Sequence, residues 1–494
     1  MDLIITITCV IVVTILCKYV YKKKNQRFYR LLEQFPSNPT YPLIGNIRLS
    51  HLSPDAFREN VANLMESTDR LIFWLGPKAF LLLKNHNDIS AVSNQCQNRE
   101  VFGLMDEWGG LGIATAPEEE WKKSRKLLTP AFSSQMLRKY LEVFKRNSLI
   151  LVDKLKPLAD SDQEFDIWPY TLSININTIV ENTTGVTYGD KGEIETDYGH
   201  AITKGMQSIA NRWLSPWLYV RFIYWIYLYI TGEYKLIKKV QDLPTKIIKE
   251  VMKDSKNLSN QLENANSSKT IVDLLVKGNS NEYGFTEIRL RDELLHIIVT
   301  GSETTALTMS FTILMLAMHQ QIQQRVYEEI TQLSNDTDEL TIDHLTNDLK
   351  YLEQCIKETA RIHAPVGILL LKPRKELTLN DGKIIPKELC IAMCNHLRHL
   401  DSDLYENPEK WDPEHYSEAA VAKRPKHSDT PFGNGPRSCL GNKYAIMSIK
   451  TQLVHILRNF HISTNLKEFT MQDLQMDLSI RSRIGYPVKL TSRR

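Results

Sequence analysis

The residues with the most distinctive chemistry lie in the stretch 431–441, PFGNGPRSCLG. Cys439 lies between two glycines and just after Arg437, and residues 442–460 have the apolar spacing of a helix. The N-terminus of a helix carries partial positive charge, which lowers the pKa of a nearby thiol and favours the thiolate. A thiolate is a strong ligand for haem iron. The stretch therefore predicts a metal-ligating Cys439, and the alternative is a buried structural cysteine.

The residues around Cys439 are suited to a bulky cofactor. Gly435 allows a turn that a side chain would block, and Gly441 lets a bulky group approach the backbone. Phe432 can shield the sulfur from water, and Arg437 can pair with a carboxylate such as a haem propionate. Together these five residues fill the pattern F-x-x-G-x-R-x-C-x-G. This pattern resembles the haem-thiolate signature of the cytochrome P450 family, which implies haem b with its iron ligated by Cys439.

A second motif lies in residues 118–129, EEEWKKSRKLLT, where acids precede bases as the helix dipole favours. Trp121 and Arg125 are four residues apart and share one face of the predicted helix. Alone, the pair is typical of a surface helix with a half-buried tryptophan. Beside the Cys439 loop it resembles the family's W-x-x-x-R motif, which contacts a haem propionate. The bases of this helix either face an acidic redox partner or form a solvated face: Lys122, Lys123 and Lys126.

A third motif, TGSETT at residues 300–305, lies in a predicted helix from about Thr286 to His319. Gly301 inside a helix costs roughly 1 kcal/mol relative to alanine, which indicates close approach of a flat ligand or a local widening. Glu303 and Thr304 place an acid and a hydroxyl at one spot, where burial without partners is expensive. A solvent-facing patch is the alternative.

This third motif resembles the family's oxygen-activation motif, A/G-G-x-D/E-T-T. The resemblance implies that Glu303 and Thr304 are catalytic and organise protons. The fatty-acid-hydroxylase branch often carries a glutamate esterified to the haem at the position of Thr300. Thr300 cannot form that ester, so we expect the haem to be held without it.

The fourth motif places Glu358 and Arg361 three apart on one helix face. Alone it is a routine surface ion pair. It resembles the family's E-x-x-R motif, which implies a structural lock that WDPEHY (411–416) completes. There His415 replaces the family's usual arginine. Because the charge of a histidine depends on pH, we expect a weaker or pH-sensitive lock.

Further assignments rest on position within the resemblance. The family often has another propionate-binding arginine after E-x-x-R, where this chain has Leu371 or Lys372, with Arg374 a little beyond. We assign that cofactor-binding role to Lys372. The candidate walls of the substrate pocket, which could equally be core residues, are Phe102, Met105, Trp108, Leu111, residues 296–304, Val366 to Leu369, and Leu478 to Ile480.

Composition limits the broad class. The 494 residues are 42% apolar and 24% charged, which is ordinary for a globular protein. A net charge of +3 is too small to argue for a nucleic-acid partner. The 7 cysteines are odd in number, scattered and without zinc-ligand spacing, which argues against a disulfide framework and for a reducing compartment.

The N-terminus predicts a membrane anchor. Residues 3–17 carry no charge and are near the short limit for a membrane span. Asp2 precedes them and lysines follow, so the positive-inside rule places the body in the cytoplasm. A cleaved signal peptide, the alternative, would want positive charge first. Residues 36–46 hold three prolines and predict a stiff hinge. We expect an endoplasmic-reticulum anchor over 1–21, a basic and proline-rich hinge over 22–46 and a catalytic domain over 47–494.

Two other segments stand out. Residues 213–230, WLSPWLYVRFIYWIYLYI, are unusually aromatic. They predict either a segment at the membrane interface or a buried aromatic cluster. Residues 254–285 are polar and predict a loop.

The resemblance covers about Pro36 to the C-terminus, and its four motifs occur in the family's order. It implies a mainly α haem-thiolate fold with a small β region. The likeness is greatest to the microsomal fatty-acid-hydroxylase branch, including its insect members. That implies a monooxygenase that inserts one oxygen atom from O2 into a small lipophilic substrate, with electrons from NADPH through NADPH-cytochrome P450 reductase and cytochrome b5 as an additional donor. The alternatives are a haem-thiolate isomerase or dehydratase, whose members tend to lack the acid–hydroxyl pair, and a membrane-anchored haem-binding protein without turnover.

Overall fold

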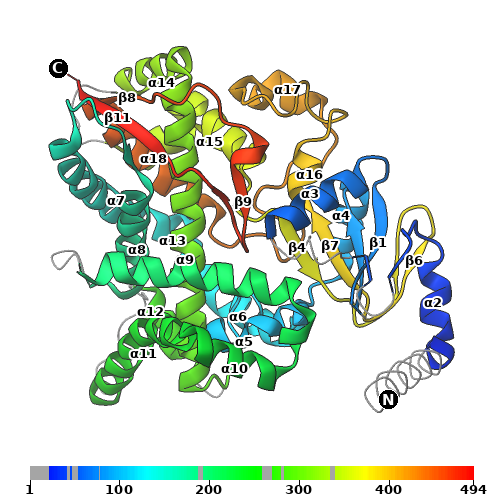
Figure 1. Cartoon of the computed structure of the whole chain (residues 1–494). Coiled ribbons are helices and arrows are strands. Elements are labelled where there is room, and N and C mark those ends of the chain that lie inside the picture. The colour runs from blue at the N-terminus through cyan, green and yellow to red at the C-terminus, as the bar shows by residue number, and fades with distance from the viewer. Residues whose placement is uncertain are drawn as a thin grey trace.

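Helices make up most of the described residues, with small sheets beside them (Figure 1). The described residues form four sheets. The computed structural model describes residues 22–41, 45–46, 54–76, 78–186, 193–258, 270–279, 283–333 and 340–493. The predicted anchor, 1–21, lies outside these residues. The expected fold class, mainly α with a small β region, is confirmed. The α-helices are α2 (Gln26–Leu32), α3 (Pro54–Met65), α4 (His86–Gln95), α5 (Asp106–Gly109), α6 (Glu118–Leu128), α7 (Ser134–Leu155), α8 (Trp168–Thr184), α9 (Glu193–Leu214), α10 (Arg221–Thr231), α11 (Glu233–Leu258), α12 (Ile271–Lys277), α13 (Glu287–Met318), α14 (Gln320–Thr331), α15 (Lys350–Ile362), α16 (Asn395–His399), α17 (Glu418–Lys423) and α18 (Asn442–Asn459).

Helix α13 is the central element and runs through the middle of the helical part (Figure 1). It begins where Thr286 accepts a hydrogen bond from the Arg289 backbone N–H, and it ends at His319, so its predicted bounds are confirmed. Among the described residues, α13 alone is long and apolar enough to cross a membrane, and 78% of that apolar stretch is buried inside the protein. Its apolar side chains therefore form the protein core.

Gly301 lies where α8 packs against α13. A Cβ atom at this position would lie 3.0 Å from Cγ1 of Ile179 in α8, tighter than an ordinary contact. The chain stays α-helical through residues 300–305. The glycine therefore permits close helix–helix packing, and the continuous α-helix corrects the expectation of a local widening.

The largest sheet has the strand order β1-β2-β7-β4. Strands β2 and β7 are parallel, with Phe80 opposite Cys390, and the other pairs are antiparallel. The remaining sheets are β3-β11-β8, β10-β9 and β5-β6. The strands are β1 (Arg70–Leu75), β2 (Lys78–Leu83), β3 (Phe165–Asp166), β4 (Ile368–Leu371), β5 (Leu377–Thr378), β6 (Ile384–Ile385), β7 (Cys390–Cys394), β8 (Phe460–Ser463), β9 (Leu474–Met476), β10 (Ile480–Ser482) and β11 (Pro487–Ser492).

The segment before the sheet is attached to it. Ser37 forms a bridge to Ile72 and Gly45 forms one to Leu75, both in β1. Helix α2 precedes these bridges, and Leu32 at its end is buried. The predicted hinge over 22–46 therefore contains a helix and two contacts with the sheet.

One of the two remaining segments differs from expectation, and the other is helical. Helix α12 falls inside the predicted loop 254–285, because the apolar run that begins at Ile271 is buried and Thr270 caps it together with Asp273. The aromatic stretch 213–230 forms the end of α9, a 3-10 turn (Pro216–Tyr219) and α10.

Candidate active site

The Cys439 loop is held by its own backbone. The Cys439 N–H donates to Phe432 O at 2.8 Å, and Gly433 N–H donates to Thr430 O at 2.9 Å. Gly435 has φ +71°, and a Cβ there would lie 2.6 Å from Ser93 O in α4. A side chain at 435 would therefore be blocked twice, by conformation and by the neighbouring chain. The loop ends at Gly441, where α18 begins as predicted.

The thiol of Cys439 lies in a protein-lined space. Burial raises its pKa, while a hydrogen bond from the Gly441 backbone and the charges of Arg125 and Arg99 act in the opposite direction. The expected lowering by the helix N-terminus is thus outweighed by burial. Cys439 is nevertheless exposed, unlike the other described cysteines. The two observations agree if the sulfur faces an internal space rather than the outer surface, and a metal cation there would deprotonate it.

Three arginines converge near this sulfur, each held by a backbone carbonyl. Arg125 Nη1 donates to Ser438 O at 2.9 Å, Arg437 Nη2 to Ala116 O at 2.6 Å, and Arg99 Nη1 to Ala114 O at 3.0 Å. Burial lowers the pKa of all three, that of Arg437 to about 8 and that of Arg99 to about 10. The Arg437 guanidinium lies 4.8 Å from the ring centre of Trp121, which is buried on the same face of α6 as Arg125.

These arginines fit the propionates of a haem. Arg437 Nε and Nη1 and Arg99 Nε are buried and have no hydrogen-bond partner within the described chain. None of the three arginines forms an ion pair with a described carboxylate. Buried cations without anions are costly, so the cluster is suited to a dianionic ligand beside a metal-binding sulfur.

Arg99 was missed from the sequence, because no local spacing marks it. The structure brings it close through Asn98, whose backbone carbonyl accepts the N–H of Lys372 at 3.0 Å. Lys372 itself had been assigned to the cofactor, but its Nζ lies 2.6 Å from a carboxylate oxygen of Glu388. The assignment of Lys372 to the cofactor is therefore corrected, because its ammonium pairs with Glu388. Arg99 is the residue that lies near Cys439.

On α13 the predicted acid and hydroxyl point in different directions. Thr304 donates to Thr300 O at 2.7 Å, and these two residues with Gly301 form an accessible stripe in the middle of the helix, where most neighbouring residues are buried. Glu303 is 2% exposed and contacts hairpin β9–β10, where it accepts from Ser479 Oγ at 2.8 Å and pairs with Arg481. Consecutive helix residues differ by about 100° in direction, so they do not share one spot.

An apolar cavity lies against the other side of the same hairpin and beside the four-stranded sheet. Its walls include Leu478 and Ile480, as predicted, and Gly367 and Ile368 from the predicted 366–369 segment. Trp108 is instead buried elsewhere, with its indole N–H donating to Tyr224 Oη at 2.9 Å. The full lining is Phe73, Leu75, Lys78, Phe80, Leu82, Leu104, Ala210, Trp213, Leu214, Tyr219, Gly367, Ile368, Leu370, Ala392, Met476, Asp477, Leu478 and Ile480.

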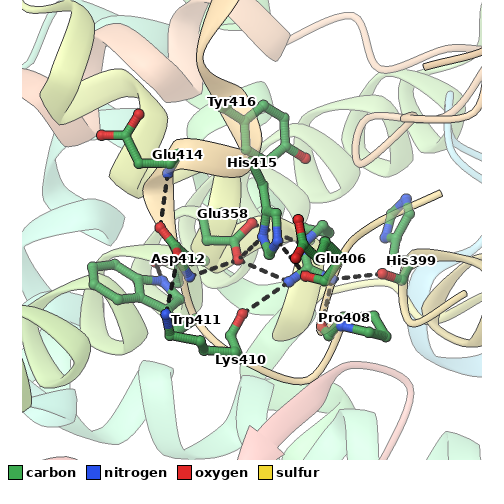
Figure 2. Close-up of polar contacts among 12 residues, drawn as sticks. Glu358, His399, Glu406, Pro408, Lys410, Trp411, Asp412, Glu414, His415 and Tyr416 are labelled. Carbon is green, nitrogen blue, oxygen red and sulfur yellow. Dashed lines mark hydrogen bonds and ion pairs between the residues drawn. The ribbon is translucent and has the colours of Figure 1, made fainter. Parts of the chain in front are cut away.

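The predicted lock is assembled and buried (Figure 2). Arg361 Nε and Nη2 donate to the two Glu358 oxygens at 2.7 and 2.8 Å, and both side chains are 0% exposed. The surface ion pair considered from sequence alone is therefore wrong. Arg361 also donates to three backbone carbonyls, those of His399, Pro408 and Lys410.

His415 completes the lock. Its Nδ1 lies 2.9 Å from Glu358 Oε1 and its Nε2 lies 2.7 Å from Glu406 O. Both partners are acceptors, so only the protonated ring satisfies both. Accordingly, the hydrogen bond to Glu358 is the main cause that raises the pKa of His415.

A haem-thiolate protein is the class that this fold and site define. The family model for cytochrome P450 matches residues 36–487, and the chain belongs to that family. It is similar to cytochrome P450 4c21 of Blattella germanica (25% identical, covering 99% of this chain and 98% of the relative), cytochrome P450 4g15 of Drosophila melanogaster (23%; 97% and 96%) and human cytochrome P450 4V2 (27%; 92% and 88%). The haem domain of a cytochrome P450DA mutant has the same fold, with a TM-score of 0.75 at 19% identity over 93% of this chain and 98% of that one.

The protein is therefore a monooxygenase of the P450 branch to which these insect and human relatives belong. Its cofactor is haem, with the iron ligated by the cysteine of the signature loop.

Proposed function

We propose that this monooxygenase oxidises a lipophilic substrate, with electrons delivered from NADPH by a membrane-bound reductase. The observation that supports the substrate class best is the apolar cavity, because most of its lining side chains are aliphatic or aromatic. The hairpin that forms one of its walls also contacts Glu303. The bound haem supplies oxygen activation and C–H oxidation.

Residues of the chain would hold the iron-ligating sulfur, the haem propionates and a proton. The Gly441 backbone N–H donates to the Cys439 sulfur, and Phe432 and Gly441 flank it. Arg99, Arg125 and Arg437, with Trp121, would hold the propionates, because Arg99 and Arg437 have buried N–H groups without a partner in the described chain and the charges of Arg99 and Arg125 act on the Cys439 thiol. Thr304 holds a proton at Oγ1 on the accessible stripe of α13.

We also propose that the substrate carries an acidic end. Lys78 lines the cavity, and its Nζ lies 4.4 Å from the ring centre of Tyr219, without a carboxylate partner among the described residues. Burial lowers the pKa of Lys78, because a buried ammonium without an anionic partner is costly. An anionic group of the substrate would offset that cost. Dodecanoic acid is therefore expected to bind more tightly than dodecanol, and Lys78→Gln is expected to remove that difference.

The redox partners would dock beside the Cys439 loop. A hollow there is lined by Phe432 and Gly433 together with the bases Arg138 and Lys443. Lys357 also lines it but pairs with Glu353, and Asp429 is a second acid of the lining. Cations at this face suit an acidic reductase, and cytochrome b5 would compete for the same face. The lysines of α6 contribute less, because Lys122 pairs with Glu118 and Lys123 with Glu120.

Helix α10 would lie on the membrane, together with the anchor predicted over residues 1–21. Tyr224 and Leu228 are fully buried, whereas Phe222, Tyr229 and Ile230 are 74%, 74% and 77% exposed. An exposed aromatic and aliphatic face on one helix fits the interfacial region of a bilayer. The endoplasmic reticulum is the proposed membrane.

The central experiment is the ferrous carbon monoxide spectrum of the membrane fraction. A long-wavelength Soret band is expected for wild type and its loss for Cys439→Ala, and a band that persists in that variant would remove Cys439 as the ligand. NADPH consumption that needs both reductase and a lipid substrate would then separate this proposal from its alternatives. An isomerase would turn over without NADPH, and a haem-binding protein would not turn over at all.

A further inference from the structure

The C-terminal hairpin connects the apolar cavity with the buried acid of α13. Leu478 and Ser479 lie in the turn of this hairpin, and Ile480 and Arg481 begin strand β10. Leu478 and Ile480 line the cavity, while Ser479 and Arg481 contact Glu303. This short stretch of the hairpin thus has a substrate-facing side and an acid-facing side.

The contacts of Glu303 are direct and buried. Ser479 Oγ donates to Glu303 Oε1 at 2.8 Å, and Arg481 Nη2 pairs with the same oxygen. Arg481 is 6% exposed and its Nε lies 3.7 Å from Asp477 Oδ2. Its guanidinium lies 5.2 Å from the ring centre of Trp168. Arg481 therefore lies between two carboxylates in the protein interior.

The charged and titratable groups around Glu303 include a single cation within the described chain. They are Arg481, Asp477 beyond it, and Tyr486. Burial raises the pKa of Tyr486, and the charge of Glu303 adds to that rise, so the phenol stays neutral. A buried carboxylate without a cation is costly, and Arg481 is the described cation that pairs with Glu303.

We propose that Arg481 is a positioning residue for the reaction, which holds Glu303 as an oriented carboxylate and links it to the wall of the substrate cavity. A substrate that displaces Leu478 or Ile480 shifts Ser479 and Arg481, because the four residues are consecutive in the turn and first positions of β10. A substrate in the cavity then changes the hydrogen bond from Ser479 and the ion pair with Arg481 that orient the Glu303 carboxylate. The role in turnover rests on the proposed function, whereas the state of the carboxylate does not.

The ion pair is tested by infrared difference spectroscopy on the full-length, haem-loaded protein at neutral pH. Arg481→Gln is expected to show the C=O stretch of a protonated buried carboxylic acid. Wild type is expected to lack this band, and the double variant R481Q/E303Q should lose it. Arg483→Gln is the matched control, because Arg483 lies two residues along the same chain and is exposed. A spectrum of R481Q identical to that of wild type would overturn the proposal.

The carbon monoxide spectrum shows whether each variant has folded and bound haem. If R481Q gives no carbon monoxide band, the infrared test is made with Arg481→Lys instead. Its carboxylic acid stretch should appear at a higher pH than in wild type, because a lysine cannot reproduce the guanidinium contact. An unchanged titration would reject the role of Arg481.

The link to turnover is tested with the reductase, NADPH and dodecanoic acid as the probe. R481Q is expected to raise the fraction of NADPH electrons lost as hydrogen peroxide several-fold, while R483Q leaves it unchanged. Equal fractions in R481Q and wild type would contradict the positioning role. If wild type gives the carbon monoxide band but does not consume NADPH with reductase and lipid, the proposed function fails, while the infrared result still decides whether the ion pair exists.

Discussion

The lock and the arginine cluster beside Cys439 both bury guanidinium groups, but they use their N–H groups differently. The N–H groups of Arg361 reach the Glu358 carboxylate and three backbone carbonyls. Arg99 and Arg437 keep buried N–H groups without a partner in the described chain. The first arrangement stabilises the fold by itself, whereas the second is stabilised only when an anion binds. Near Cys439, buried guanidinium donors without a partner are therefore the feature that suits the cluster to an anionic cofactor.

Breaking the saturated network should have the largest effect. Arg361→Met leaves the carboxylate of Glu358 buried without its cation, which is expected to cost about 3–5 kcal/mol of unfolding free energy. Denaturant unfolding of the haem-loaded protein measures the loss. The control is Lys357→Met on the same helix, whose partly exposed pair with Glu353 should contribute less than about 1 kcal/mol. Equal effects of the two substitutions would contradict the assigned lock.

The same substitution in the unsaturated cluster should act with the opposite sign. Arg437→Met removes a buried, unpaired cation, so the haem-free protein should keep or gain stability. Haem should nevertheless dissociate about 10–100-fold faster, since a charge-assisted hydrogen bond contributes about 1.5–3 kcal/mol. Transfer of haem to apomyoglobin measures the rate. A haem-free protein destabilised as much as R361M would show that the cluster is structural.

Two adjacent threonines on α13 sharpen the same distinction with neutral groups. Thr304 lies on the accessible stripe, while Thr305 is buried and donates to Gly301 O at 2.7 Å. Thr304→Ala should keep its haem and lose several-fold more reducing equivalents as hydrogen peroxide, and Thr305→Ala should not. The peroxide formed per NADPH consumed gives the answer. If the two variants behave alike, Thr304 has no role in proton delivery.

The smallest expected effect is the pH dependence of the lock. The pKa of His415 is raised above its ordinary value because the Glu358 carboxylate accepts a hydrogen bond from the protonated ring. A raised pKa means that the stabilisation is complete below about pH 6.5 and is lost as pH rises through the folded-state pKa. The stability difference between wild type and His415→Asn should therefore shrink by about 1 kcal/mol on going to alkaline pH. Thermal unfolding across that range measures it, and parallel curves would exclude His415 as the titrating group.

Local spacing predicted those parts of the site that lie within a few residues of one another. The Cys439 loop, the Trp121–Arg125 face and the Glu358–Arg361 pair all follow from helix geometry or turn chemistry. The start and end of α13 follow from its cap and apolar length.

Contacts between distant segments were not predictable in this way. Arg481 is 178 residues from Glu303, and Arg99 reaches the cysteine region through the backbone contact of Asn98 with Lys372. Strand pairing and loop packing decide such contacts, and no periodicity encodes them. The thiol pKa was also misjudged, because the spacing reveals the helix terminus but not the depth of burial that outweighs it.

The tight turn at Gly435 has a consequence for how the enzyme is made. Its backbone lies against Ser93 of α4, and hydrogen bonds within the loop hold the Cys439 backbone. The position of the metal-binding turn therefore depends on a contact with a distant helix. A side chain introduced at position 435 would disturb that contact during folding, so the yield of coloured enzyme should fall although residue 435 is not the iron ligand.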